Sequence, residues 1–137
     1  MKDTHMASSS PLLSVRHLRV EIPTRQGPLV ALDDVSFDIA RGEILGFVGE
    51  SGAGKSLTGM AVLGLLDAPA RVAAGQIVFD GQAIEALPQA RMRELRGKRI
   101  AAVFQDPLLS LNPLLTVGDQ LVETLCTHLP LTAGEAR

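Results

Sequence analysis

The chain has 137 residues, a formal net charge of −2 and a hydrophobic fraction of 46%, values that fit one globular domain of ordinary size. There is no basic excess to indicate a nucleic-acid partner, and no apolar run approaches the length of a membrane span. The single cysteine, Cys126, excludes an internal disulfide and fits a reducing compartment.

Two alternating segments near the N-terminus predict an antiparallel β layer. Residues 1–10 are expected to be a disordered tail or a tag, so the fold should begin at residue 11. In residues 18–22, apolar Leu18, Val20 and Ile22 alternate with polar residues, and residues 35–39 repeat the pattern. Alternation with period two indicates half-buried strands, joined here by a turn over residues 23–28.

The next segment combines a buried strand, a Gly-rich loop and a helix. Residues 44–48 form an apolar run typical of a parallel strand buried on both faces. The pattern G-x-x-x-x-G-K-S follows and identifies a phosphate-binding P-loop. Its residues are Gly49, Glu50, Ser51, Gly52, Ala53, Gly54, Lys55 and Ser56. A helix is expected over residues 57–65, with Asp67 and Pro69 as its stop.

Each residue type in the P-loop has a separate chemical role. Glycines allow backbone conformations that residues with a Cβ avoid, and the N–H groups from Gly52 to Leu57 can surround a phosphate at the positive end of the helix dipole. Lys55 would contact the β- and γ-phosphates, and the Ser56 hydroxyl would bind Mg²⁺. The simpler interpretation, a Gly-rich turn that happens to precede Lys-Ser, does not require the flanking strand and helix. The sequence therefore predicts a site for a magnesium-bound nucleotide.

Further along, residues 76–79 predict a short strand, and Asp80-Gly81 is a hairpin signal. A helix is expected over residues 88–96, closed by Gly97. The basic residues of this region are Arg91, Arg93, Arg96, Lys98 and Arg99. A solvated helix with cations at its negative end explains them better than a nucleic-acid patch does, because no aromatic residue is interleaved.

Residues 100–104 form a second apolar strand, which ends in Gln105-Asp106-Pro107. A polar residue at the end of a core strand in an open α/β sheet lies near the ligand crevice. A strand-ending turn, which Asp106-Pro107 would explain unaided, is the alternative.

Two motifs in this order resemble the nucleotide-binding domain of an ABC transporter. Residues 49–56 resemble its Walker A motif, and residues 103–107 its Q-loop. Residues 108–113 and 115–121 resemble the oligopeptide/dipeptide branch of ABC importers, and residues 31–37 fit the strand before the P-loop. The implied fold is α/β, a P-loop NTPase core with parallel strands plus an antiparallel β layer, as in ABC ATPases.

The resemblance implies a partial domain. Residues 11–112 would hold the antiparallel layer and the P-loop core, and residues 113–137 would begin the helical subdomain. The LSGGQ-like signature, the Walker B strand and the switch histidine are not found before Arg137, and His5, His17 and His128 are interpreted as structural or surface residues. A capping-box pattern over residues 132–135 predicts the start of another helix. We expect the N-terminal half of a domain, truncated before the signature and Walker B motifs.

The resemblance also implies roles for residues and partners. Gln105 would act with Lys55 in catalysis by reaching Mg²⁺ and the attacking water, and Ile22 occupies the position of the aromatic that usually stacks on adenine. The complete protein would bind and hydrolyse ATP to drive uptake of di- or oligopeptides. Its partners would be transmembrane permease subunits, a second nucleotide-binding domain and, indirectly, a solute-binding protein, at the cytoplasmic face of the inner membrane.

Rival interpretations make different predictions. The fragment alone, lacking the carboxylates that complete the metal site, is expected to bind Mg-ATP weakly with negligible turnover. It could instead belong to a non-transport ABC ATPase of translation or DNA repair, or act as a non-hydrolysing ATP-binding fragment that occupies permease docking sites. A P-loop small-molecule kinase would leave Gln105 and the residues after it unexplained.

Overall fold

The computed structural model describes residues 10–104 and 111–137. The chain divides into two compact units, Met1–Pro88 and Gln89–Arg137.

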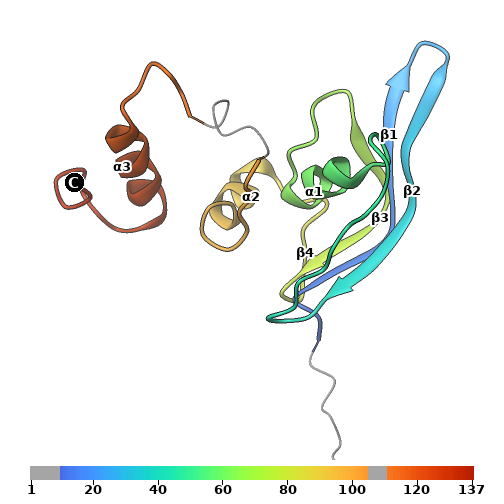
Figure 1. Cartoon of the computed structure of the whole chain (residues 1–137), viewed down its shortest axis with the longest axis horizontal. Coiled ribbons are helices and arrows are strands. Elements are labelled where there is room, and N and C mark those ends of the chain that lie inside the picture. The colour runs from blue at the N-terminus through green and yellow to red at the C-terminus, as the bar shows by residue number, and fades with distance from the viewer. Residues whose placement is uncertain (1–9, 105–110) are drawn as a thin grey trace, which may run out of the picture. The chain divides into compact units, whose positions relative to one another are not determined.

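The first unit is built on an antiparallel sheet of four strands in the order β2-β1-β3-β4 (Figure 1). The strands are β1 (Leu13–Thr24), β2 (Gly27–Ile39), β3 (Arg71–Phe79) and β4 (Gln82–Ala83). β1 is central because it pairs with both β2 and β3. The predicted antiparallel layer is confirmed, and its first two strands extend farther than the alternating segments, leaving only residues 25 and 26 as the turn.

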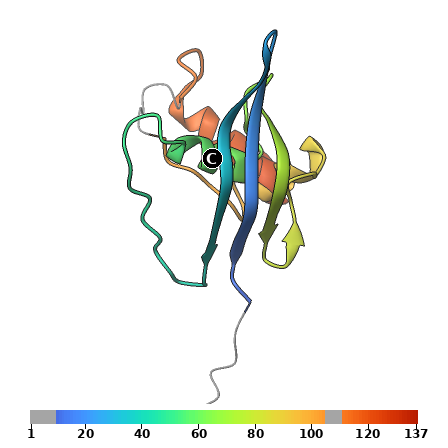
Figure 2. The same cartoon turned by 90° about the vertical axis from the view of Figure 1, so that its right-hand side faces the viewer.

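One face of this sheet and the helix α1 (Lys55–Leu63) form the core of the first unit (Figures 1 and 2). The largest fully buried side chains on the strands are Val15, Leu18, Val20 and Ile77. The helix buries Thr58, Ala61 and Leu63. α1 ends at Gly64, which has a left-handed φ of 62°, and not at the expected Asp67 and Pro69. Glycine adopts this conformation without steric cost and so closes the helix earlier.

The β3–β4 hairpin confirms the Asp80-Gly81 prediction. Asp80 has φ 49° and Gly81 has φ 79°, and the flanking residues Phe79 and Gln82 are partners in the ladder. Two consecutive positive φ values characterise the two-residue turn whose twist matches that of the strands it joins.

The regular alternation in β1 is interrupted by a bulge. The register shifts between Val15 and Leu18, and His17 takes a positive φ of 49°. Because an extra residue changes which face each side chain occupies, Val15 and Leu18 are both buried although they lie three residues apart.

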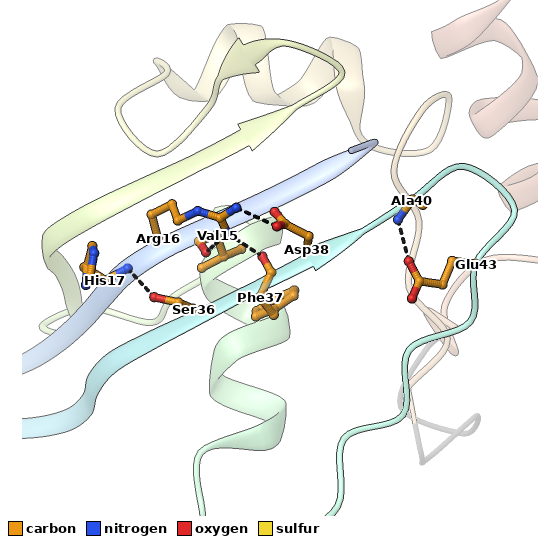
Figure 3. Close-up of polar contacts among 8 residues, drawn as sticks. All are labelled: Val15, Arg16, His17, Ser36, Phe37, Asp38, Ala40 and Glu43. Atoms are coloured by element: carbon orange, nitrogen blue, oxygen red, sulfur yellow. Dashed lines mark hydrogen bonds and ion pairs between the residues drawn. The ribbon is translucent and has the colours of Figure 1, made fainter. Parts of the chain in front are cut away.

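Polar side chains connect β1 and β2 (Figure 3). Arg16 donates to the Asp38 carboxylate at 2.5 Å and to the Phe37 carbonyl at 3.2 Å, and the His17 N–H donates to Ser36 Oγ at 2.8 Å. The hydrogen bond from Arg16 lowers the pKa of Asp38 below its ordinary value. The interpretation of His17 as a surface residue is confirmed, because its side chain is 77% exposed.

The second unit contains α2 (Gln89–Leu95) and α3 (Val117–His128). The predicted helix over residues 88–96 is confirmed, and Gly97, with φ 79°, follows it. α3 begins at an N-cap, Thr116, whose hydroxyl accepts the Asp119 N–H at 3.1 Å. The capping-box contact after α3 is present, since the Thr132 N–H donates to the Glu135 carboxylate at 2.8 Å, but residues 133–136 form a turn and not the first turn of a helix.

No helix within the described part of the chain is both long and apolar enough to cross a membrane.

The structure corrects the prediction of strands at residues 44–48 and 100–104. Neither segment is a strand, and Ile44, Val48 and Val103 are 96% exposed or more. Within residues 10–104 and 111–137, the only β pairing outside the named strands is an isolated bridge between Arg96 and Ile100. An extended segment becomes a strand only by pairing with a neighbour, and neither segment belongs to a named strand in the part of the chain that the structure describes. Among those residues the parallel part of the predicted core is therefore not formed.

Candidate functional site

The P-loop joins residues 44–48 to the first turn of α1 and takes its shape from two glycines. Gly52 and Gly54 have φ values of 83° and 85°, a left-handed conformation that side chains with a Cβ rarely adopt. Gly54 is the N-cap of α1. Within the loop, the Ala53 N–H donates to the Glu50 carbonyl at 3.2 Å and closes a turn.

The first turn of α1 supplies amide donors. The first intrahelical bond runs from the Thr58 N–H to the Gly54 carbonyl at 2.9 Å. The amides of Lys55, Ser56 and Leu57 have no acceptor within the helix, because the carbonyls four residues before them lie outside it. These groups, at the positive end of the helix dipole, are suited to an anion. The Ala53 amide is an exception to the prediction of a phosphate contact, because it donates to the Glu50 carbonyl.

Lys55 folds back over the P-loop. Its Nζ donates to the carbonyls of Gly49 and Glu50 at 2.7 and 2.6 Å. These bonds hold the ammonium close to the loop backbone. The positive end of the α1 dipole and the ammonium of its first residue both favour an anion at this loop.

The residues present fit a nucleotide polyphosphate with a bound cation. Left-handed glycines, amides without intrahelical acceptors and a lysine meet the needs of the phosphates. Ser56, the second residue of α1, is exposed and could contribute one hydroxyl oxygen to Mg²⁺, a cation that otherwise keeps waters and takes phosphate oxygens.

Two of the predicted site residues lie away from this loop in the sequence. Ile22 is half-buried in β1 and pairs with Leu29 of β2 near the hairpin turn; its contact with adenine stays a prediction. Gln105 lies outside the described residues, as do residues 106–110.

Comparison with known proteins identifies the family. Residues 32–136 match the family described as "ABC transporter". The chain belongs to the ABC transporter family.

Among curated members of the ABC transporter family, the chain is 45% identical over 125 residues to the oligopeptide transport ATP-binding protein OppD of Escherichia coli, covering 91% of this chain and 37% of OppD. It is 44% identical over 117 residues to the dipeptide transport ATP-binding protein DppD of Haemophilus influenzae, covering 85% of this chain and 36% of DppD. The chain thus spans little more than a third of the length of these relatives.

A solved structure confirms the fold class. The ATP-binding cassette MJ0796, a dimer bound to ADP and Pi, matches with a TM-score of 0.77 and 22% identity, over 90% of this chain and 52% of that one. At this identity the likeness concerns the fold alone. It establishes the α/β fold of ABC ATPases, of which the antiparallel layer, the P-loop and α1 are formed here.

Proposed function

We propose that this chain is the nucleotide-binding part of an ABC importer subunit that binds and hydrolyses ATP to drive uptake of di- or oligopeptides. The observation that carries the proposal is the P-loop at the start of α1, where left-handed glycines lead into the first turn and the Lys55 ammonium lies against the loop backbone. The transported class is supported by the names of the relatives, which are oligopeptide and dipeptide transport proteins.

The site would work by positioning and charge neutralisation, which account for most of the catalysis in phosphoryl transfer. Lys55 would exchange its loop carbonyls for the β- and γ-phosphate oxygens, while the backbone of residues 49–57 cradles the chain of phosphates. Ser56 and Gln105 would hold Mg²⁺, which when bound neutralises charge on the phosphates. Gln105 would also orient the attacking water, and Ile22 would contact the adenine.

The partners follow from the same proposal. The subunit would lie peripherally at the cytoplasmic face of the inner membrane, bind transmembrane permease subunits through the helical subdomain that begins near residue 113, and pair with a second nucleotide-binding domain. A solute-binding protein would act indirectly through the permeases. Support for pairing comes from the solved cassette of the same fold, which is dimeric.

Calorimetric titration of the 137-residue chain with Mg-ATP tests the proposal. Removing the ammonium with Lys55→Ala should weaken binding by about tenfold to a hundredfold, because hydrogen bonds to charged groups contribute roughly 1.5–3 kcal/mol. Lys98→Ala, which removes a lysine outside the loop, is the matched control and should bind like the original chain. Absence of ATP binding, or equal affinity of the two variants, would contradict the proposal.

Turnover is a separate readout. We expect phosphate release by this chain to be negligible, because the residues assigned to the reaction, Lys55, Ser56 and Gln105, include no carboxylate to complete the metal site or orient water. Steady-state release abolished by Lys55→Ala would show that the described residues and Gln105 suffice for hydrolysis.

A further inference from the structure

Leu32 of β2 packs directly against Gly54 of the P-loop. Its side chain is almost fully buried, with 5% exposure, and it lies opposite Val20 of β1. A Cβ added to Gly54 would lie 2.4 Å from Leu32 Cδ2 and 3.7 Å from the Ala31 carbonyl oxygen. A δ-methyl of Leu32 therefore occupies the space where a side chain on Gly54 would begin.

The contact falls at the point that sets the direction of the binding groups. Gly54 is the N-cap of α1 and has no side chain with which to cap the helix, so its position depends on packing and on the helix itself. On the helix side, the Gly54 carbonyl accepts both the N–H and the hydroxyl of Thr58, at 2.9 and 3.0 Å. On the sheet side, the Leu32 side chain fills the space next to Gly54. Lys55 and the amides of the first turn follow immediately along the chain.

We propose that Leu32 is a positioning residue for the phosphate-binding loop. It touches no phosphate and acts through Gly54: its methyl group fixes the cap of α1, and the cap fixes the direction of the first amides and of Lys55. Small displacements of such groups matter because binding and catalysis depend on their geometry to within about 1 Å. The inference rests on the proposed function of this loop.

The test separates positioning from general stability. Leu32→Ala and Leu18→Ala make the same change at two buried positions of one sheet, 5% and 0% exposed, but Leu18 lies opposite Val35 at the bulge of β1. For each variant of the full 137-residue chain, the affinities for ATP and AMP are measured with Mg²⁺. Their ratio isolates the contribution of the β- and γ-phosphates.

Leu32→Ala is expected to lower the ratio of ATP to AMP affinity by about tenfold, equivalent to losing roughly one charge-assisted hydrogen bond, whereas Leu18→Ala leaves it unchanged. If both variants lower the ratio equally, or if Leu32→Ala leaves it intact, the inference is wrong. Should either alanine variant fail to fold, the milder pair Leu32→Val and Leu18→Val replaces them, because loss of one methylene costs less.

A second measurement needs no nucleotide. In the free protein, Leu32→Val should speed hydrogen exchange of the Thr58 amide, which bonds to Gly54, more than Leu18→Val does, after correction for global stability. Equal exchange in the two variants would overturn the inference. Failure of the original chain to bind ATP, with the difference in exchange still present, would refute the proposed function and leave the positioning contact standing.

Discussion

Replacing Gly75 by alanine should destabilise the sheet far more than the addition of one methyl group normally does. Gly75 lies in β3 beside the bulge of β1 and has a φ of 95°. An added Cβ would lie 2.5 Å from the His17 carbonyl oxygen, 2.6 Å from Leu18 Cα and 2.7 Å from the Arg16 carbonyl oxygen. All three are backbone atoms, so no rotation of a side chain can relieve the overlap.

The expected cost has two parts. A residue with a Cβ in the left-handed region loses about 1–2 kcal/mol, and forcing extra volume into a packed site costs about 1–3 kcal/mol more. Gly75→Ala should therefore lower the free energy of unfolding by roughly 2–5 kcal/mol, a large fraction of the ~5–15 kcal/mol that stabilises a typical domain.

Gly81→Ala is the matched control. Gly81 also has a positive φ, 79°, but an added Cβ would meet nothing within 4 Å, so only the conformational part, about 1–2 kcal/mol, applies. Urea unfolding followed by circular dichroism compares the two variants, with equal m-values as the check that both unfold between similar states. Equal losses of stability would refute the steric argument and imply that β1 and β3 separate at the bulge without cost.

Two further predictions concern polar contacts. The hydrogen bond from Arg16 lowers the pKa of Asp38 from its ordinary 3.8. The ionised Asp38 carboxylate therefore stabilises the folded state above pH 3.8, and this stabilisation is lost as the pH falls through the folded-state pKa. When the free energy of unfolding is measured between about pH 5 and about pH 2, it should fall less for Asp38→Asn than for the original chain. The same pH dependence in the two proteins would contradict this. In the second unit, Thr116→Ala removes the bond from the Asp119 N–H and should cost about 1 kcal/mol of helix stability, seen as reduced helical ellipticity. Thr127→Ala, inside the same helix, should not reduce it, because alanine is the better helix former; equal losses would argue against the cap.

Much of the local structure could be read from the sequence because short-range physics decides it. The alternation of Leu18, Val20 and Ile22 predicted β1, since burial of one face requires period two. Asp80-Gly81 predicted its hairpin because these residues accept the positive φ values that the turn needs. The P-loop was recognisable for the same reason: its glycines and lysine must be adjacent in the chain to surround one phosphate.

Tertiary structure decided what depends on partners distant in the sequence. The apolar runs at residues 44–48 and 100–104 have strand-like composition, but pairing is a property of two segments, and neither run is one of the strands of the described residues. The bulge at His17 and the need for glycine at position 75 arise only when β1 and β3 lie side by side. The contact of Leu32 with Gly54 likewise joins residues that no local pattern connects. Sequence alone therefore determined the chemistry of the loop, because its residues are neighbours in the chain. The packing of Leu32 against the loop depends on the tertiary structure, because it forms only when the sheet and α1 pack together and exclude water from the space between them.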